Sequence, residues 1–129
     1  MQRALLISLG GAIGTLARYL TSVAAARMLG VDFPWGTLCV NLFGSFAIGF
    51  VQTLSLDALL ISDDARLFLS TGIMGGLTTY SAFSYESVRL AEIGAWPQAV
   101  FYLVITTVAS LGLCYLGMGA GRLLVGPGS

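Results

Sequence analysis

Apolar residues fill four long stretches of the chain, and short polar segments at residues 32–34, 62–66 and 94–97 separate them. Each stretch is close to the ~20 residues that a helix needs to cross the hydrocarbon core of a bilayer. The pattern therefore predicts one domain, residues 1–129, that is an all-α membrane protein. Its four transmembrane helices are expected at about 5–26, 35–56, 67–90 and 98–124.

The composition supports a membrane location. Apolar residues make up 57% of the chain and charged residues 9%, whereas a soluble domain carries roughly 25% charged residues. Six arginines balance six acids, and this neutrality argues against nucleic acid, which requires a basic surface. The chain contains no histidine and the apolar stretches hold no paired acids, so we expect no enzymatic activity. We expect a multi-pass protein of the cell membrane, in contact with lipid.

The third apolar stretch contains an unusual segment, residues 72–83, with the sequence Gly-Ile-Met-Gly-Gly-Leu-Thr-Thr-Tyr-Ser-Ala-Phe. The adjacent Gly75 and Gly76 weaken a helix, and Thr78 and Thr79 offer hydrogen bonds that compete with those of the helical backbone. Inside a bilayer, unwound backbone is tolerated only where protein buries it or where it lines a wet cavity. Because such breaks mark ion and substrate sites, we expect a third helix broken in mid-membrane beside a permeation site.

Glycines four residues apart occur in three of the predicted spans: Gly10 with Gly14, Gly72 with Gly76, and Gly117 with Gly121. Small residues at this spacing let helices approach closely in lipid. We expect the pairs in the first and fourth spans to set packing distances, whereas the additional Gly75 favours a break in the third.

The arginines are distributed almost evenly between the two sides of the membrane. If both termini lie on one side, that side holds Arg3, Arg66 and Arg122, and the other holds Arg27 and Arg89. Because Arg and Lys bias determines orientation, a chain so balanced can insert in both orientations. The pattern favours an antiparallel, dual-topology homodimer with its two-fold axis in the membrane plane. The alternative, that so few charges do not report topology, remains open.

Several polar residues fall within the predicted spans, where each needs a partner. Arg18 has two open roles: it ties helices together through carbonyl groups, or it draws anions toward a vestibule. The amide of Asn41 either links helices or donates its NH2 group to an anion. Thr106 and Ser110 are four residues apart, so their hydroxyls lie on one helix face, although hydroxyls in helices often bond back to the preceding turn.

Tyr80 and Phe83 directly follow the predicted break. Aromatic rings have an electropositive edge, so rings presented edge-on attract an anion without a formal charge. Conduction also requires binding weak enough for the ion to leave, and ring edges with neutral donors meet this requirement for a small anion. The alternative is that both rings only pack against protein or lipid.

Three segments in order resemble the Fluc/CrcB fluoride channels: residues 11–19, residues 35–45, and residues 75–84 with the sequence Gly-Gly-Leu-Thr-Thr-Tyr-Ser-Ala-Phe-Ser. The resemblance implies a fluoride-selective channel that lets cytoplasmic fluoride leave the cell passively and so reduces fluoride toxicity. The membrane that it implies is the bacterial inner membrane. It also implies an antiparallel dual-topology homodimer with two fluoride pores.

The resemblance also implies site residues and a cofactor. A structural sodium ion is implied at the dimer centre, held by the main-chain carbonyls of Gly75 and Thr78. The implied pore residues are Asn41, Tyr80, Phe83, Thr106 and Ser110. The family usually has Phe where this chain has Tyr80, and the additional hydroxyl either adds a polar station or slows the ion.

Two other functions remain open. A small dual-topology, proton-coupled drug exporter needs a titratable acid deep in the membrane, and Glu86 and Glu92 lie only toward the end of the third span. A non-conducting membrane assembly subunit accounts for the glycine pairs but not for the polar segment in the third stretch.

Overall fold

The computed structural model describes residues 1–126, and the regular structure of these residues is helical. The last three residues of the predicted domain lie outside the described residues. Among the described residues, six elements are α-helical and two are π-helical. In chain order they are α1 (Gln2–Leu29), α2 (Trp35–Gln52), η1 (Thr53–Asp57), α3 (Asp63–Arg66), η2 (Leu67–Met74), α4 (Gly75–Leu77), α5 (Tyr80–Glu92) and α6 (Trp96–Val125).

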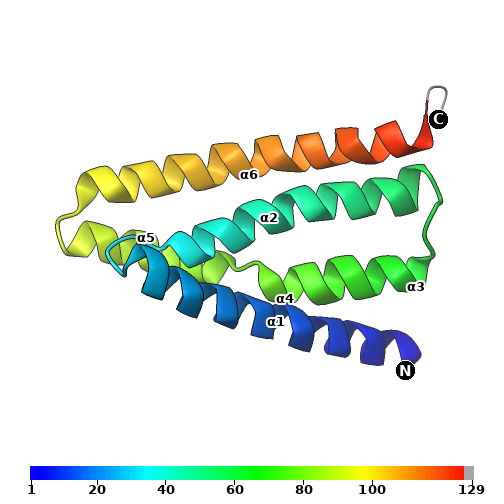
Figure 1. Cartoon of the computed structure of the whole chain (residues 1–129), viewed down its shortest axis with the longest axis horizontal. Coiled ribbons are helices and arrows are strands. Elements are labelled where there is room, and N and C mark those ends of the chain that lie inside the picture. Colours follow the sequence, from blue (N-terminus) through cyan, green and yellow to red (C-terminus); the bar gives the residue numbers. More distant parts are fainter. Residues whose placement is uncertain (127–129) are drawn as a thin grey trace.

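The helices form an elongated bundle, and the first and last described segments, the start of α1 and the end of α6, lie at the same end of it (Figure 1). Helix α2 packs along α6, and α1 packs along η2 and α4. Segments α3, η2 and α4 follow one another in line and lead into α5 (Figure 1). These elements cover the four apolar stretches, although the third stretch is divided among several shorter segments.

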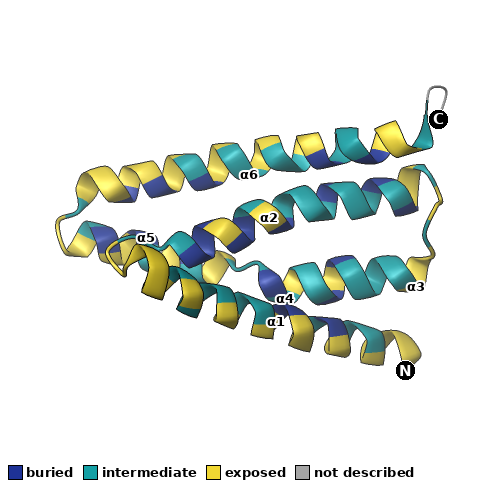
Figure 2. Cartoon of the chain, viewed as in Figure 1, coloured by how far each residue is buried: buried dark blue, intermediate teal, exposed yellow. Residues whose placement is uncertain are grey.

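Three helices of the described chain are long and apolar enough to cross a membrane: α1, α2 continued by η1, and α6. The apolar window is 44% buried for α2 but only 11% for α1 and 17% for α6, so α2 is the most enclosed of the three. Exposed residues recur along the outer sides of α1 and α6 (Figure 2), and they include large apolar side chains such as Leu9 and Leu111. This distribution suits a lipid environment, because lipid tails are as apolar as these side chains and their exposure to lipid costs little free energy.

Glycines set the close approach of α1 to the third apolar stretch. A Cβ on Gly10 would lie 2.6 Å from Phe68 O, and one on Gly14 would collide with Ile73 O. On the facing side, a Cβ on Gly76 would lie 2.5 Å from Gly11 O. The small residues therefore allow backbone-to-backbone contact here, as the glycine spacing predicts.

The chain is extended at Thr78 and Thr79, between α4 and α5. Their φ and ψ angles are −85° and 155° for Thr78, and −153° and 117° for Thr79. Gly75 and Gly76, in contrast, are helical. The helix is therefore interrupted at the threonines that follow the glycine pair and not at the glycines themselves. Gly76 instead provides close packing against Gly11 and Thr15 of α1.

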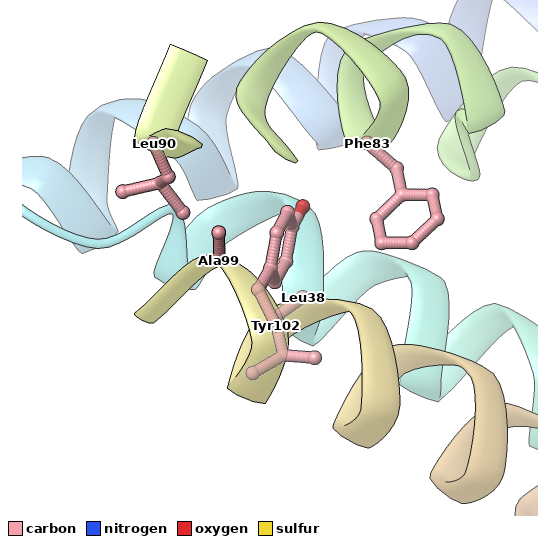
Figure 3. Packing of buried hydrophobic residues seen from close by; sticks show 5 residues of the cluster. All are labelled: Leu38, Phe83, Leu90, Ala99 and Tyr102. Atoms are coloured by element: carbon pink, nitrogen blue, oxygen red, sulfur yellow. The ribbon is translucent and has the colours of Figure 1, made fainter. Parts of the chain in front are cut away.

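A cluster of buried side chains holds α5 against α2 and α6. Figure 3 shows its members: Leu38, Phe83, Leu90, Ala99 and Tyr102. Tyr102 is fully buried, and its ring meets Phe83 edge-on with centroids 5.1 Å apart. The cluster determines where the start of α5 lies, and with it the position of Phe83.

Candidate functional site

A cavity of about 410 Å³ lies beside the extended threonines. Helices α2, α5 and α6 and the segment around Gly75 contribute its walls. All five predicted pore residues line it: Asn41, Tyr80, Phe83, Thr106 and Ser110. Gly75 and Thr78, whose main-chain carbonyls are the predicted sodium ligands, line it as well. Residues from three separate parts of the chain therefore meet at one place.

Asn41 holds the extended segment in place. Its Nδ2 donates to Thr79 O at 3.1 Å, and its Oδ1 accepts from Thr79 N at 2.8 Å. Both polar groups of one non-helical residue are thereby satisfied, which matters because unpaired backbone groups are costly away from water. An amide carries two N–H donors, and the two bonds to Thr79 use only one of those of Asn41, which lines the cavity. The linking role of Asn41 is thus visible, and the pore role stays a prediction.

The threonine side chains cap the two helix ends. Thr78 Oγ1 donates to Met74 O at 2.8 Å, one turn back in the helix. Thr79 Oγ1 accepts from Ala82 N at 3.2 Å and so caps the start of α5. A capping side chain replaces a hydrogen bond that the first helical turn lacks, so these residue types favour an interruption at this position.

The interruption frees main-chain carbonyls at the end of α4. In a continuous helix Gly75 O would accept from Thr79 N, but Thr79 N donates to Asn41 instead. Gly76 O is bound from the other side, because Arg18 Nε of α1 donates to it at 3.1 Å. Arg18 therefore ties α1 to this segment, which is one of the two roles expected for it, and its role in drawing anions stays a prediction.

The two aromatic rings differ sharply in environment. Phe83 is 6% exposed, whereas Tyr80 is 79% exposed in the single chain. Their centroids are 5.6 Å apart at an interplanar angle of 70°, an edge-to-face arrangement. Each ring in the series Tyr80, Phe83, Tyr102 thus meets the next edge-on, so in each pair the positive edge of one ring lies against the negative face of the other.

The hydroxyls of α6 complete the cavity wall. Thr106 is 7% exposed, and its Oγ1 has no hydrogen-bond partner among the described residues. A buried hydroxyl without a partner costs free energy, so a water molecule or an ion in the cavity would stabilise it. Ser110 is one turn further along the same face and also lines the cavity.

The structure also assembles a polar group that the sequence reasoning did not place in the site. Glu86 Oε2 accepts from Thr37 Oγ1 at 3.1 Å, and Glu86 Oε1 accepts from Tyr102 OH at 3.3 Å. Tyr102 contacts Phe83, so this group adjoins the aromatic row. Glu86 lies three residues after Phe83, one helical turn away, and that spacing was the signal in the sequence.

Comparison with known proteins identifies close relatives. Residues 5–118 match the family described as "CrcB-like protein, Camphor Resistance (CrcB)". A protein of Anaeromyxobacter sp. (strain K) named "Fluoride-specific ion channel FluC" is 49% identical over 125 residues, which are 97% of this chain and 96% of the relative. Proteins of the same name from Agrobacterium fabrum and Clostridium perfringens are 45% and 42% identical, and the matches cover 92% and 94% of this chain and 95% and 94% of those relatives.

Proposed function

The chain belongs to the family of CrcB-like proteins, and we propose that it is a fluoride-selective channel through which cytoplasmic fluoride leaves the cell passively. Its relatives bear the name of fluoride channels. The observation in this chain that carries the proposal is the cavity in which the amide of Asn41, the hydroxyls of Thr106 and Ser110, and the rings of Tyr80 and Phe83 meet. The alternative functions, drug export and membrane assembly, are not supported by these relatives.

The chemistry of the cavity suits a small, strongly hydrated anion. An ion that leaves water needs close donors in its place, and an amide, hydroxyls and ring edges are donors without formal charge. Neutral donors attract the ion less strongly than an arginine would, so the ion can leave again. A larger halide would make poorer contacts with several donors at once in a narrow site.

We infer that residues 67–90 form a third span that is interrupted in mid-membrane at Thr78 and Thr79. Backbone that leaves a helix at membrane depth needs protein or a wet cavity around it. Asn41 pairs with Thr79, and the cavity adjoins both threonines. These contacts support the interruption as a stable feature of a four-span, multi-pass protein of the cell membrane, in bacteria the inner membrane.

We also propose that two copies assemble as an antiparallel homodimer. The nearly even arginine distribution permits both orientations. Tyr80, beside the cavity, is exposed in the single chain. A Cβ on Gly75 would find only Ser70 O, at 3.8 Å, so nothing in the described chain requires a glycine at this exposed position. The close approach of a second copy would explain it.

The carbonyl groups at the interruption fit a sodium ion at the centre of this dimer. Gly75 O has lost its helical donor to Asn41, and oxygen ligands suit a hard cation. Within the described chain no group of three or more His, Cys, Asp or Glu side chains is placed to hold a metal, so main-chain oxygens of Gly75 and Thr78 are the proposed ligands. The bound ion would neutralise converging carbonyl dipoles.

Passive ion flux from liposomes tests the function. Purified chain is reconstituted with a potassium ionophore to balance charge, and fluoride and chloride release are recorded with ion-selective electrodes. Fluoride release without comparable chloride release supports the proposal, and absence of fluoride release from well-folded protein contradicts it.

Sodium is tested separately by exchanging it for a large organic cation. We expect fluoride flux to fall after exchange and to return with sodium. Gly75→Val should impair flux more than Thr78→Ser. The proposed ligands are main-chain oxygens, so a bulky side chain that shifts the backbone should displace them, whereas serine at position 78 should leave them in place. Flux that is unchanged without sodium would exclude the proposed ion.

A further inference from the structure

Three cavities follow one another along the groove between α2 with η1 and α6. The site cavity shares Ile48 with a second cavity of about 380 Å³. The second shares Thr53 and Asp57 with a third of about 170 Å³, which Arg122 also lines. Helices α2 and α6 lie side by side toward the end of the bundle where α1 begins and α6 ends (Figure 1). The series therefore leads from the interruption to one end of the molecule.

The sequence provides this groove through helical spacing. Residues that line the first two cavities recur on one face of α2: Asn41, Ser45, Ile48 and Gln52. In α6, residues four apart line the three cavities in turn: Thr106 and Ser110 the first, Cys114 and Met118 the second, and Arg122 the third. Positions with these spacings share one helix face, so the three cavities lie in series along the same faces of the two helices.

The second cavity is mostly apolar, and Gln52 is one of its few polar lining residues, together with Thr53 and Asp57. Gln52 Oε1 is buried and has no hydrogen-bond partner among the described residues. A buried amide without a partner costs free energy. By rotation the same side chain can present two N–H donors in place of the oxygen. The amide is thus placed to contact water or an ion that passes through this cavity.

The groove ends between charges of opposite sign. Asp57 and Arg122 are exposed residues that line the third cavity, and neither belongs to the ion pairs found among the described residues. A charge at the mouth of a cleft changes the local concentration of ions. Arg122 would raise the concentration of an anion at this mouth, and Asp57 would lower it.

We propose that this groove is the path by which fluoride moves between the site cavity and the end of the molecule, with Gln52 as a contact on the way and Arg122 and Asp57 controlling entry. This inference rests on the proposed channel function and adds residues to it. No step requires a charge at mid-membrane, because the charged pair lies at the end of the helices.

Charge substitutions at different ionic strengths test the path. In reconstituted protein at low ionic strength, Arg122→Gln should lower fluoride flux about threefold and Asp57→Asn should raise it by a similar factor. In 1 M of an impermeant salt both differences should disappear, since charges are then screened within about 3 Å. Arg122→Lys keeps the charge and should retain the flux of the unmodified chain. A defect in folding would not respond to salt in this way.

Arg89→Gln and Glu92→Gln are matched controls. These residues form an exposed ion pair, 3.9 Å apart, near the end of α5 that lies at the opposite end of the bundle (Figure 1). They line none of the three cavities of the groove, so their substitution should leave flux unchanged. Gln52→Leu, which removes the amide at similar volume, should lower flux at both salt concentrations.

The outcomes distinguish this inference from the proposed function. If the unmodified chain conducts fluoride but Arg122→Gln and Asp57→Asn behave like the controls, or differ equally at both salt concentrations, the groove is not the path. If the unmodified chain does not conduct fluoride, the channel function fails and this inference fails with it.

Discussion

Phe83 lies between Tyr80 and Tyr102, with ring centroids 5.6 and 5.1 Å away. Replacing Phe83 by Ile removes the ring edge and keeps a side chain of similar size. We expect fluoride flux to fall about tenfold, which corresponds to ~1.4 kcal/mol, within the range for ring interactions. The free energy of unfolding should fall by only about 1 kcal/mol. Liposome flux and thermal unfolding in detergent measure the two effects.

Phe33→Ile is the matched control for Phe83. The Phe33 ring also meets Tyr102 edge-on, with centroids 5.4 Å apart, but Phe33 does not line the site cavity. Phe33→Ile should therefore lower the free energy of unfolding by a similar amount to Phe83→Ile and leave fluoride flux nearly unchanged. Equal flux in the two variants would mean that Phe83 only packs.

Tyr80 is mostly exposed beside the cavity, so its hydroxyl is not needed to fill a core. Tyr80→Phe keeps the ring edge and removes a group that can hold an ion. We expect flux to be maintained or increased, up to about threefold, because conduction improves when the ion leaves more easily. Tyr85→Phe, on the same helix, is the control, since Tyr85 is also exposed but does not line the cavity. A clear loss of flux in Tyr80→Phe alone would show that the hydroxyl assists passage.

At the scale of elements, the join between α4 and α5 depends on Asn41. Asn41→Leu removes both hydrogen bonds to Thr79 and leaves the peptide groups of that residue without partners. We expect a loss of about 2–4 kcal/mol in the free energy of unfolding. Amide hydrogen exchange should also increase first at Thr79. Ser45→Ala removes only a bond to Asn41 O within α2, so it should have little effect; equal destabilisation would contradict the proposed role of Asn41.

The contact of α1 with α4 gives a second prediction, which compares two adjacent glycines. A Cβ on Gly76 would lie 2.5 Å from Gly11 O and 3.0 Å from Thr15 N. Gly76→Ala should therefore destabilise the single chain, by about 2 kcal/mol. Gly75→Ala has space in the chain, so it should leave folding intact and weaken the proposed dimer or its sodium site. Thermal unfolding and crosslinking in membranes separate these effects; a Gly75→Ala protein that dimerises and conducts normally would remove this argument for close approach.

At the scale of the whole molecule, the arginine distribution predicts insertion in both orientations. Cys39 and Cys114 are first replaced by Ser, and one cysteine is introduced at the exposed Asp32 in the connection between α1 and α2. A membrane-impermeant thiol reagent should label about half of the protein from each side of the cell membrane if the two orientations pair one to one. Labelling from one side only would exclude dual topology.

The sequence by itself determined the class of molecule and the residue types of the candidate site. Hydropathy and segment length are local properties, so they predicted helices over the four apolar stretches. The motif around Thr78 to Phe83 pointed to the same family that the comparison with known proteins identifies. Glycine spacing likewise predicted close helix packing, because a residue without a side chain lets the backbones of two helices approach each other wherever it faces a neighbour.

Only the tertiary structure decided how these residues are used. Gly75 and Gly76 weaken a helix by intrinsic preference, yet they are helical because α1 packs against this segment. Thr79 leaves the helix because Asn41, 38 residues earlier in the chain, supplies both of its hydrogen bonds. The partners of Glu86 come from two other helices in the same way. Local sequence sets the conformation that a residue favours by itself, but the partners of Thr79 and Glu86 are distant in sequence, and only packing brings them together.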